Sequence, residues 1–201
     1  MKNLNCPPSS CVGKIDARVV KKLSKRFKLD PSYLDCLSVC HGGEPQLNTI
    51  QLATDRLTLA FFLTMLDGKS RLPGGFQPHF AYPTVDARVI NSVGCIMDSD
   101  SNTSRCLFGK LVPFAATQKD MCLDGGYVDL FCFDYRQTLD PPPIVLWVAH
   151  CAMDAYFDWD DLPFEDKFDD TGCCANVPWD RFLKPIAGSF SEFVLMLEQG
   201  Q

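Results

Sequence analysis

Apolar and polar positions follow helical periods in the first quarter of the chain. In residues 14–28, apolar residues recur at every fourth position among basic ones, which predicts an amphipathic helix with one buried stripe. A second helix is expected from Asp30-Pro31, because Asp suits the N-cap and proline the first turn. Gly42-Gly43 ends it, since glycine adopts the left-handed conformation without strain. The stripe of the first helix is Ile15, Val19, Leu23 and Phe27.

The middle of the chain holds an apolar run and a second helical stripe. Residues 57–66 are apolar nearly throughout, and periodicity does not separate a buried strand from a buried helix there. Residues 71–83 contain three prolines and a Gly-Gly pair, which predicts a loop. A helix is then expected over 84–97, capped by Thr84, before a polar loop at 98–104.

The remaining pattern predicts strands followed by a helix. Residues 107–114 are interpreted as a short strand or edge element, 127–133 as a strand, and 144–149 as another, in which Trp147 suits a pleated surface. Ser189 and Glu192 have the spacing of a capping box, which marks the start of a final helix. The buried face of that helix is expected to be Phe190, Phe193, Val194 and Leu197.

The segment 154–170 interleaves eight acidic residues with aromatic ones, and Lys167 is its only base. A solvated acidic loop is one interpretation. The other is a docking surface for a basic partner, because interfaces are rich in Tyr, Trp and Phe while charges steer the encounter. The predicted partner-binding residues are Asp158, Trp159, Asp160, Asp161, Phe164, Glu165, Asp166, Asp169 and Asp170.

Length and charge limit the alternatives. A chain of 201 residues is expected to form one domain, here 14–198, with 1–13 as a loose lead-in and 151–184 as an acidic, insertion-like segment. The net charge of −6 disfavours nucleic acid as the partner, because phosphates need clustered Lys and Arg. The basic helix at 14–28 is open to a membrane-surface or RNA interpretation, but a solvated face over a core stripe is favoured.

The cysteines and the N-terminal residues indicate the cellular compartment in which the protein is expected to function. No apolar signal region begins the chain, and no apolar run approaches the roughly 20 residues that span a bilayer. We therefore expect a cytoplasmic protein with reduced thiols and no membrane contact. The odd count of 11 cysteines argues against a complete disulfide framework.

Few residues suggest bond chemistry. Cys36 and Cys40 share a predicted helix face and could bind zinc together, but no CxxC pair completes such a site, so buried thiols are favoured. His150 and Cys151 follow a strand end, and because adjacent strand residues point to opposite faces, a catalytic pair is disfavoured. No phosphate-binding glycine motif is present. The sequence therefore predicts no catalytic residue, no metal and no cofactor.

Five stretches, in order, resemble motifs of the SUKH superfamily, which includes the yeast cell-wall-assembly regulator family and many bacterial immunity proteins. The segment 41–48 resembles its Asn-Gly-Gly-Glu-Pro turn, with His41 where Asn is usual. Leu111–Ala115, the Asp-Gly-Gly turn and strand of 124–134, the Pro-to-His strand of 143–150, and 189–193 are similar to the motifs that follow.

The resemblance implies an α+β fold, with a mainly antiparallel sheet flanked by helices, and no catalytic residues. It also implies a function, an immunity protein that binds and occludes a cognate bacterial toxin domain, a nuclease or a deaminase. One alternative is a regulatory scaffold like the yeast relative, which gene context would distinguish. Another is a thiol-dependent enzyme that uses Cys151 or Cys132, which alkylation of the thiols would inactivate.

Overall fold

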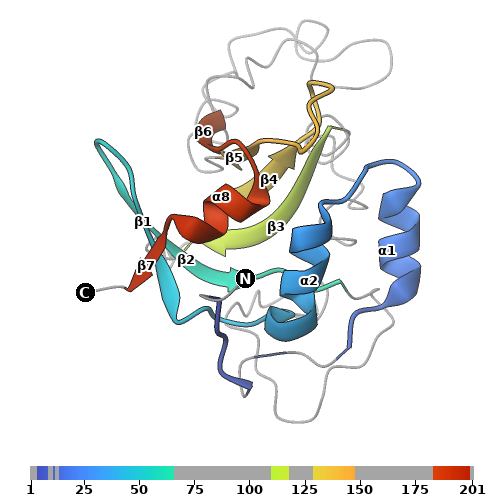
Figure 1. Cartoon of the computed structure of the whole chain (residues 1–201), viewed down its shortest axis with the longest axis horizontal. Helices are drawn as coiled ribbons and strands as arrows, with labels where there is room; N and C mark the ends of the chain where they lie inside the picture. Colours follow the sequence, from blue (N-terminus) through green and yellow to red (C-terminus); the bar gives the residue numbers. More distant parts are fainter. Residues whose placement is uncertain are drawn as a thin grey trace, which may run out of the picture.

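The computed structural model describes residues 4–8, 11, 14–65, 110–117, 129–147 and 183–199. In this part of the chain, helices pack against a curved sheet (Figure 1). The described residues therefore form a mixed helix-and-sheet structure, as the α+β prediction requires. Its strands are β1 (Leu47–Gln51), β2 (Arg56–Phe62), β3 (Leu111–Thr117), β4 (Leu130–Asp134), β5 (Ile144–Trp147), β6 (Leu183–Ala187) and β7 (Leu197–Gln199).

The basic amphipathic segment forms helix α1 (Ala17–Ser24). Asp16 is its N-cap, and the carboxylate accepts a hydrogen bond from the backbone N–H of Arg18 at 2.8 Å. The basic Lys21 and Lys22 are exposed, which agrees with the favoured interpretation of a solvated face over a core stripe. The buried stripe includes three of the predicted residues, Val19, Leu23 and Phe27.

Helix α2 (Pro31–Cys40) begins and ends where the sequence predicts. Asp30 is the N-cap and accepts from the backbone N–H of Ser32 at 2.8 Å, while Pro31 occupies the first turn. The helix stops at a turn in which Gly42 has a φ of 69°, a left-handed conformation that glycine adopts without a steric penalty. The Asp-Pro start and the Gly-Gly stop are both confirmed.

The sheet has seven strands in the order β6-β5-β4-β3-β2-β1-β7 within the described residues, and every neighbouring pair is antiparallel. The ambiguous apolar run at 57–66 becomes the strand β2 and its continuation, so the helix alternative is wrong there. The edge interpretation of 107–114 is also wrong, because β3 lies at the centre and all of its residues are buried.

Proline is rare in a central strand, because it has no N–H to donate to a neighbour. Strand β3 nevertheless contains Pro113, which pairs with Cys132 of β4. The register of these two strands shifts between Pro113 and Ala115. The irregularity therefore falls at the proline, where one hydrogen-bond donor of the ladder is missing.

The C-terminal helix α8 (Phe190–Leu195) begins at the predicted capping box. The hydroxyl of Ser189 accepts from the N–H of Glu192 at 3.2 Å, and the Glu192 carboxylate accepts from the N–H of Gly188 at 2.7 Å. Three residues of the predicted buried face lie on this helix, while Leu197 belongs to β7. All four are buried, namely Phe190, Phe193, Val194 and Leu197.

An aromatic cluster joins helices α2 and α8 to the same part of the sheet. The ring of Tyr33 in α2 lies 5.8 Å from Phe114 in β3, 5.1 Å from Phe133 in β4 and 5.3 Å from Phe190 in α8, between ring centroids. The ring of Phe193 lies 5.2 Å from that of Phe114. Edge-to-face contacts of this kind add to the free energy gained by burial, so this cluster is the centre of the core.

The N-terminal residues differ from the loose lead-in expected for 1–13. Leu4 and Cys6 are buried, and the carbonyl of Asn5 accepts from the N–H of Gln46 at 2.8 Å. Cys6 also forms a disulfide with Cys40. The helix predicted at 84–97 and the loops predicted at 71–83 and 98–104 lie outside the described residues.

Candidate functional site

The acidic surface predicted from the sequence lies entirely outside the described residues. This applies to Asp158, Trp159, Asp160, Asp161, Phe164, Glu165, Asp166, Asp169 and Asp170. His150 and Cys151 lie outside them as well, whereas Cys132 is described. The described part contains two other places where chemically distinctive side chains gather.

The first is a shallow groove of about 390 Å³ between the chain that leaves α1 and the β4–β5 connection. Phe27 and Tyr135 form an aromatic pair here, with ring centroids 4.9 Å apart. The guanidinium of Arg26 lies 5.2 Å from the centre of the Phe27 ring, which is a cation–π distance. The remaining lining residues are Lys28, Gln137, Thr138, Leu139, Asp140 and Pro142.

Polar contacts hold the two sides of the groove together. The hydroxyl of Tyr135 donates to the carbonyl of Lys28 at 2.7 Å, and the ammonium of Lys28 pairs with the carboxylate of Asp140. Burial raises the pKa of Tyr135, and the carboxylates of Asp30 and Asp140 raise it further, so the hydroxyl stays protonated and continues to donate.

The groove presents an apolar contact next to charges of both signs. Leu139 is 54% exposed, which leaves this apolar side chain available for contact. Arg136 is held beside the groove, because its guanidinium donates to the buried Asp134 carboxylate at 2.8 Å. Its lining combines aromatic, apolar and charged side chains and contains no Ser, Cys or His, so it offers contacts that suit a partner's side chain.

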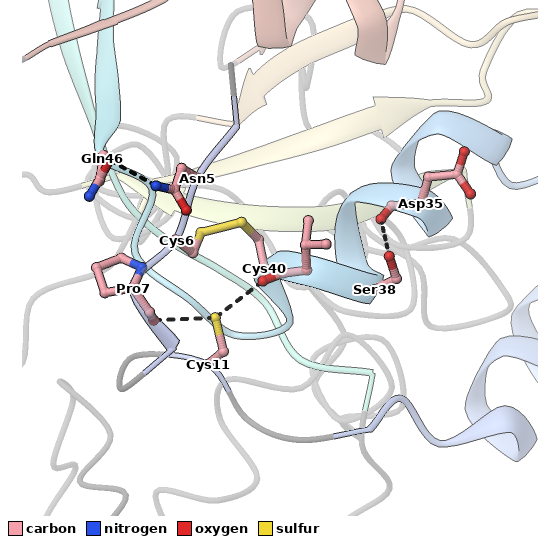
Figure 2. The surroundings of a disulfide bond; sticks show 9 residues. Asn5, Cys6, Pro7, Cys11, Asp35, Ser38, Cys40 and Gln46 are labelled. Atoms are coloured by element: carbon pink, nitrogen blue, oxygen red, sulfur yellow. Dashed lines mark hydrogen bonds between the residues drawn. A yellow bond between two sulfur atoms is a disulfide. The ribbon is translucent and has the colours of Figure 1, made fainter. Parts of the chain in front are cut away.

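The second place is a cluster of cysteines at the end of α2. Cys6 and Cys40, which are 34 positions apart, form a disulfide with a Cα–Cα distance of 5.4 Å. Figure 2 shows the bond between the N-terminal segment and the last residue of the helix. The expectation of reduced thiols is therefore wrong for Cys6 and Cys40, because the fold places them within bonding distance.

Cys11 carries a thiol beside this bond (Figure 2). Its sulfur lies 3.4 Å from the carbonyl oxygen of Val39 and 3.5 Å from that of Pro7, and can donate its hydrogen to either. A Cβ placed on Gly43 would meet the Cys11 sulfur at 2.7 Å and the Cys6 sulfur at 3.2 Å. Both sulfurs therefore use the space that the glycine leaves open.

The other described thiols, Cys36 and Cys132, are buried, and for Cys36 burial is the favoured sequence prediction. Burial raises the pKa of Cys36, and the nearby Cys11 raises it further, so Cys36 remains a protonated thiol. The pKa of Cys132 is also raised, first by burial and then by the Asp134 carboxylate. A raised pKa makes Cys132 a poor nucleophile, which weakens the interpretation of this thiol as catalytic.

His41 has a structural contact in this region. It is 2% exposed, and its Nε2 accepts a hydrogen bond from the backbone N–H of Met65 at 2.7 Å. Among the described residues, no three His, Cys, Asp or Glu side chains are arranged to hold a metal ion. None of the described helices has the length and apolar character that a membrane crossing requires.

Sequence reasoning missed the pairing of Cys6 with Cys40 and the position of Cys11 next to them. The spacing of Cys36 and Cys40 indicates that two cysteines lie on one face of α2, and this is the one sequence signal that cysteines gather there. Nothing local to Cys6 indicates its partner, because cysteine connectivity does not follow from sequence spacing. No protein-family model, curated protein or solved structure matches this chain.

Proposed function

We propose that this chain is an immunity protein of the SUKH type, which binds a cognate bacterial toxin domain and occludes it. The observation that carries the proposal is how the residues that resemble the family motifs are arranged. Three of the stretches contribute the adjacent strands β3, β4 and β5, and a fourth forms α8. Phe193 of α8 packs on Phe114 and Phe131, at 5.2 Å and 5.1 Å between ring centroids.

The remaining motif, at 41–48, joins the same body. It follows α2, contains the left-handed Gly42 and runs into β1. The carbonyl of Gly43 accepts from the N–H of Phe62 in β2 at 3.0 Å, which ties the turn to the sheet. Stretches that are far apart in sequence but pack as one unit support the resemblance better than isolated similarities do.

The toxin-binding surface in this proposal is the acidic segment at 158–170. Its carboxylates would mimic the phosphates that a nuclease toxin binds, while Trp159 and Phe164 would be the apolar anchors. The protein then acts by occlusion and performs no bond chemistry. The groove beside Leu139 is the competing surface, because it combines an exposed apolar side chain with basic neighbours.

Binding to the toxin domain encoded next to this gene tests the proposal. The full chain is expected to form a tight complex and to suppress the toxin's activity. Changing Asp158, Asp160, Asp161, Glu165 and Asp166 to Asn or Gln is expected to slow association and to reduce its salt dependence, because exposed charges act mainly on the encounter rate. A matched control is Asp35→Asn with Glu198→Gln, since both residues are exposed.

The groove provides the second comparison. If Leu139→Ala with Lys28→Ala weakens the complex while the acidic variants do not, the binding surface is the groove and the proposed acidic surface is wrong. If the full chain neither binds nor inhibits the toxin domain, the immunity function itself is rejected.

A further inference from the structure

The Cys6–Cys40 disulfide is shielded from solvent on both sides. Cys6 is 6% exposed and Cys40 is fully buried, so a dissolved thiol has no open approach to either sulfur. Cys11 is only partly buried and lies at the same end of α2 (Figure 2). Among the described cysteines near this bond, Cys11 is therefore the sulfur that reaches both solvent and the disulfide.

We propose that Cys11 and the Cys6–Cys40 disulfide form a thiol–disulfide exchange site, through which small thiols of the glutathione class reduce the buried bond. The inference does not depend on the toxin-binding proposal. It rests on the place where a Cβ of Gly43 would stand, because the sulfurs of Cys11 and Cys6 lie 2.7 Å and 3.2 Å from that point. Both sulfurs therefore border the space that Gly43 leaves open.

The first step exchanges one disulfide for another. The Cys11 thiol loses its proton to solvent, and the thiolate attacks the Cys6 sulfur. The bond between Cys6 and Cys40 breaks as the Cys6–Cys11 bond forms, and Cys40 leaves as a thiolate that takes up a proton. No electrons are gained or lost in this step.

The second step is a net reduction by the external thiol. One glutathione thiolate attacks the Cys11 sulfur and releases Cys6 as a thiol, which leaves glutathione joined to Cys11. A second glutathione attacks the sulfur of the bound glutathione and releases Cys11. Two glutathione thiols are thereby oxidised to one glutathione disulfide, and the protein gains two thiols.

The exchange changes what the covalent bond connects. In the starting state it joins the N-terminal segment to the last residue of α2. After the first step it joins two residues of the N-terminal segment, so the cross-link to α2 is lost and, apart from the backbone that continues into α1, noncovalent contacts hold the segment. These include the hydrogen bond between the Asn5 carbonyl and the N–H of Gln46 at 2.8 Å. The redox state of the cell would therefore control how firmly this segment is held.

Peptide mapping of the full chain during reduction by glutathione tests the inference. Trypsin places Cys6 and Cys11 in the peptide 3–14, and Cys36 and Cys40 in the peptide 29–56. The starting disulfide joins the two peptides, whereas the exchanged bond makes peptide 3–14 lighter by two hydrogens. Samples quenched in acid and alkylated are expected to show the exchanged peptide, and glutathione on Cys11, before full reduction.

Substitutions distinguish the exchange from direct attack. Cys11→Ser is expected to slow the loss of the Cys6–Cys40 bond at least tenfold, and Cys36→Ser to leave the rate unchanged. Gly43→Ala retains every thiol but adds a methyl group that would crowd both sulfurs and force them to shift, so it is also expected to slow the reaction. Equal rates for Cys11→Ser and wild type, or early glutathione on Cys6 or Cys40, would overturn the inference.

Discussion

The hydroxyl of Tyr33 is a polar group at the centre of an aromatic core. The residue is fully buried, and its hydroxyl has no hydrogen-bond partner within the described part of the chain. A buried hydroxyl without a partner loses its hydration and gains nothing in return. Tyr33→Phe is therefore expected to leave the free energy of unfolding unchanged or to raise it by up to about 1 kcal/mol, as measured by urea denaturation.

Tyr33 also makes the free energy of unfolding depend on pH. An unfolded tyrosine has a pKa near 10.0, while burial holds the pKa of Tyr33 well above this value, and Cys36 and Tyr135 raise it further. Above pH 10 the unfolded state binds fewer protons than the folded one, so wild-type stability falls as pH rises. The advantage of Tyr33→Phe should therefore grow above pH 10, and a constant difference across that range would contradict this account.

Among the elements, α2 depends on a single capping residue. One carboxylate oxygen of Asp30 accepts from the N–H of Ser32 at 2.8 Å and from its hydroxyl at 2.5 Å. Asp30→Ala removes the acceptor and is expected to lower the free energy of unfolding by about 1–2 kcal/mol. Asp30→Asn keeps an acceptor oxygen in place and is expected to lose much less. Equal losses for both variants in thermal or urea unfolding would show that the negative charge matters more than the cap.

Elements with local signals could be predicted from the sequence. The helices α1, α2 and α8 follow short-range rules of capping, proline placement and glycine stops. Their apolar stripes identify the buried faces. The strands β1, β6 and β7 went unpredicted, because they are short and take their partners from distant parts of the chain. Lys184 and Pro185 in β6 are exposed, which hides any strand-like apolar pattern.

Which distant segments of the chain pair with one another could not be predicted from the sequence. The apolar content of β3 indicates a buried strand, but its central position depends on partners that no local pattern identifies, and its Pro113 is unusual in a central strand. Cys6 similarly contacts Cys40 only because α2 and the turn at Gly42 bring the end of the helix beside the N-terminal segment. The acidic segment at 158–170 was identified by composition alone, and its role remains a prediction.

The Cys6–Cys40 disulfide contributes to the stability of the molecule as a whole. It links residues with a sequence separation of 34, so it restricts the unfolded state as well as fastening the N-terminal segment. Replacing Cys6 and Cys40 together by Ala is expected to lower the free energy of unfolding by about 2–4 kcal/mol.

Urea denaturation of this double variant without reductant provides the measurement, and Cys11→Ser is the control. Cys11 is outside the bond, so its substitution is expected to change stability by no more than about 0.5 kcal/mol. Reduced wild-type protein should match the double variant, because both lack the constraint on the unfolded chain. If the double variant is as stable as Cys11→Ser, the bond adds nothing to the fold. Its opening would then release the N-terminal segment without weakening the sheet and helices behind it.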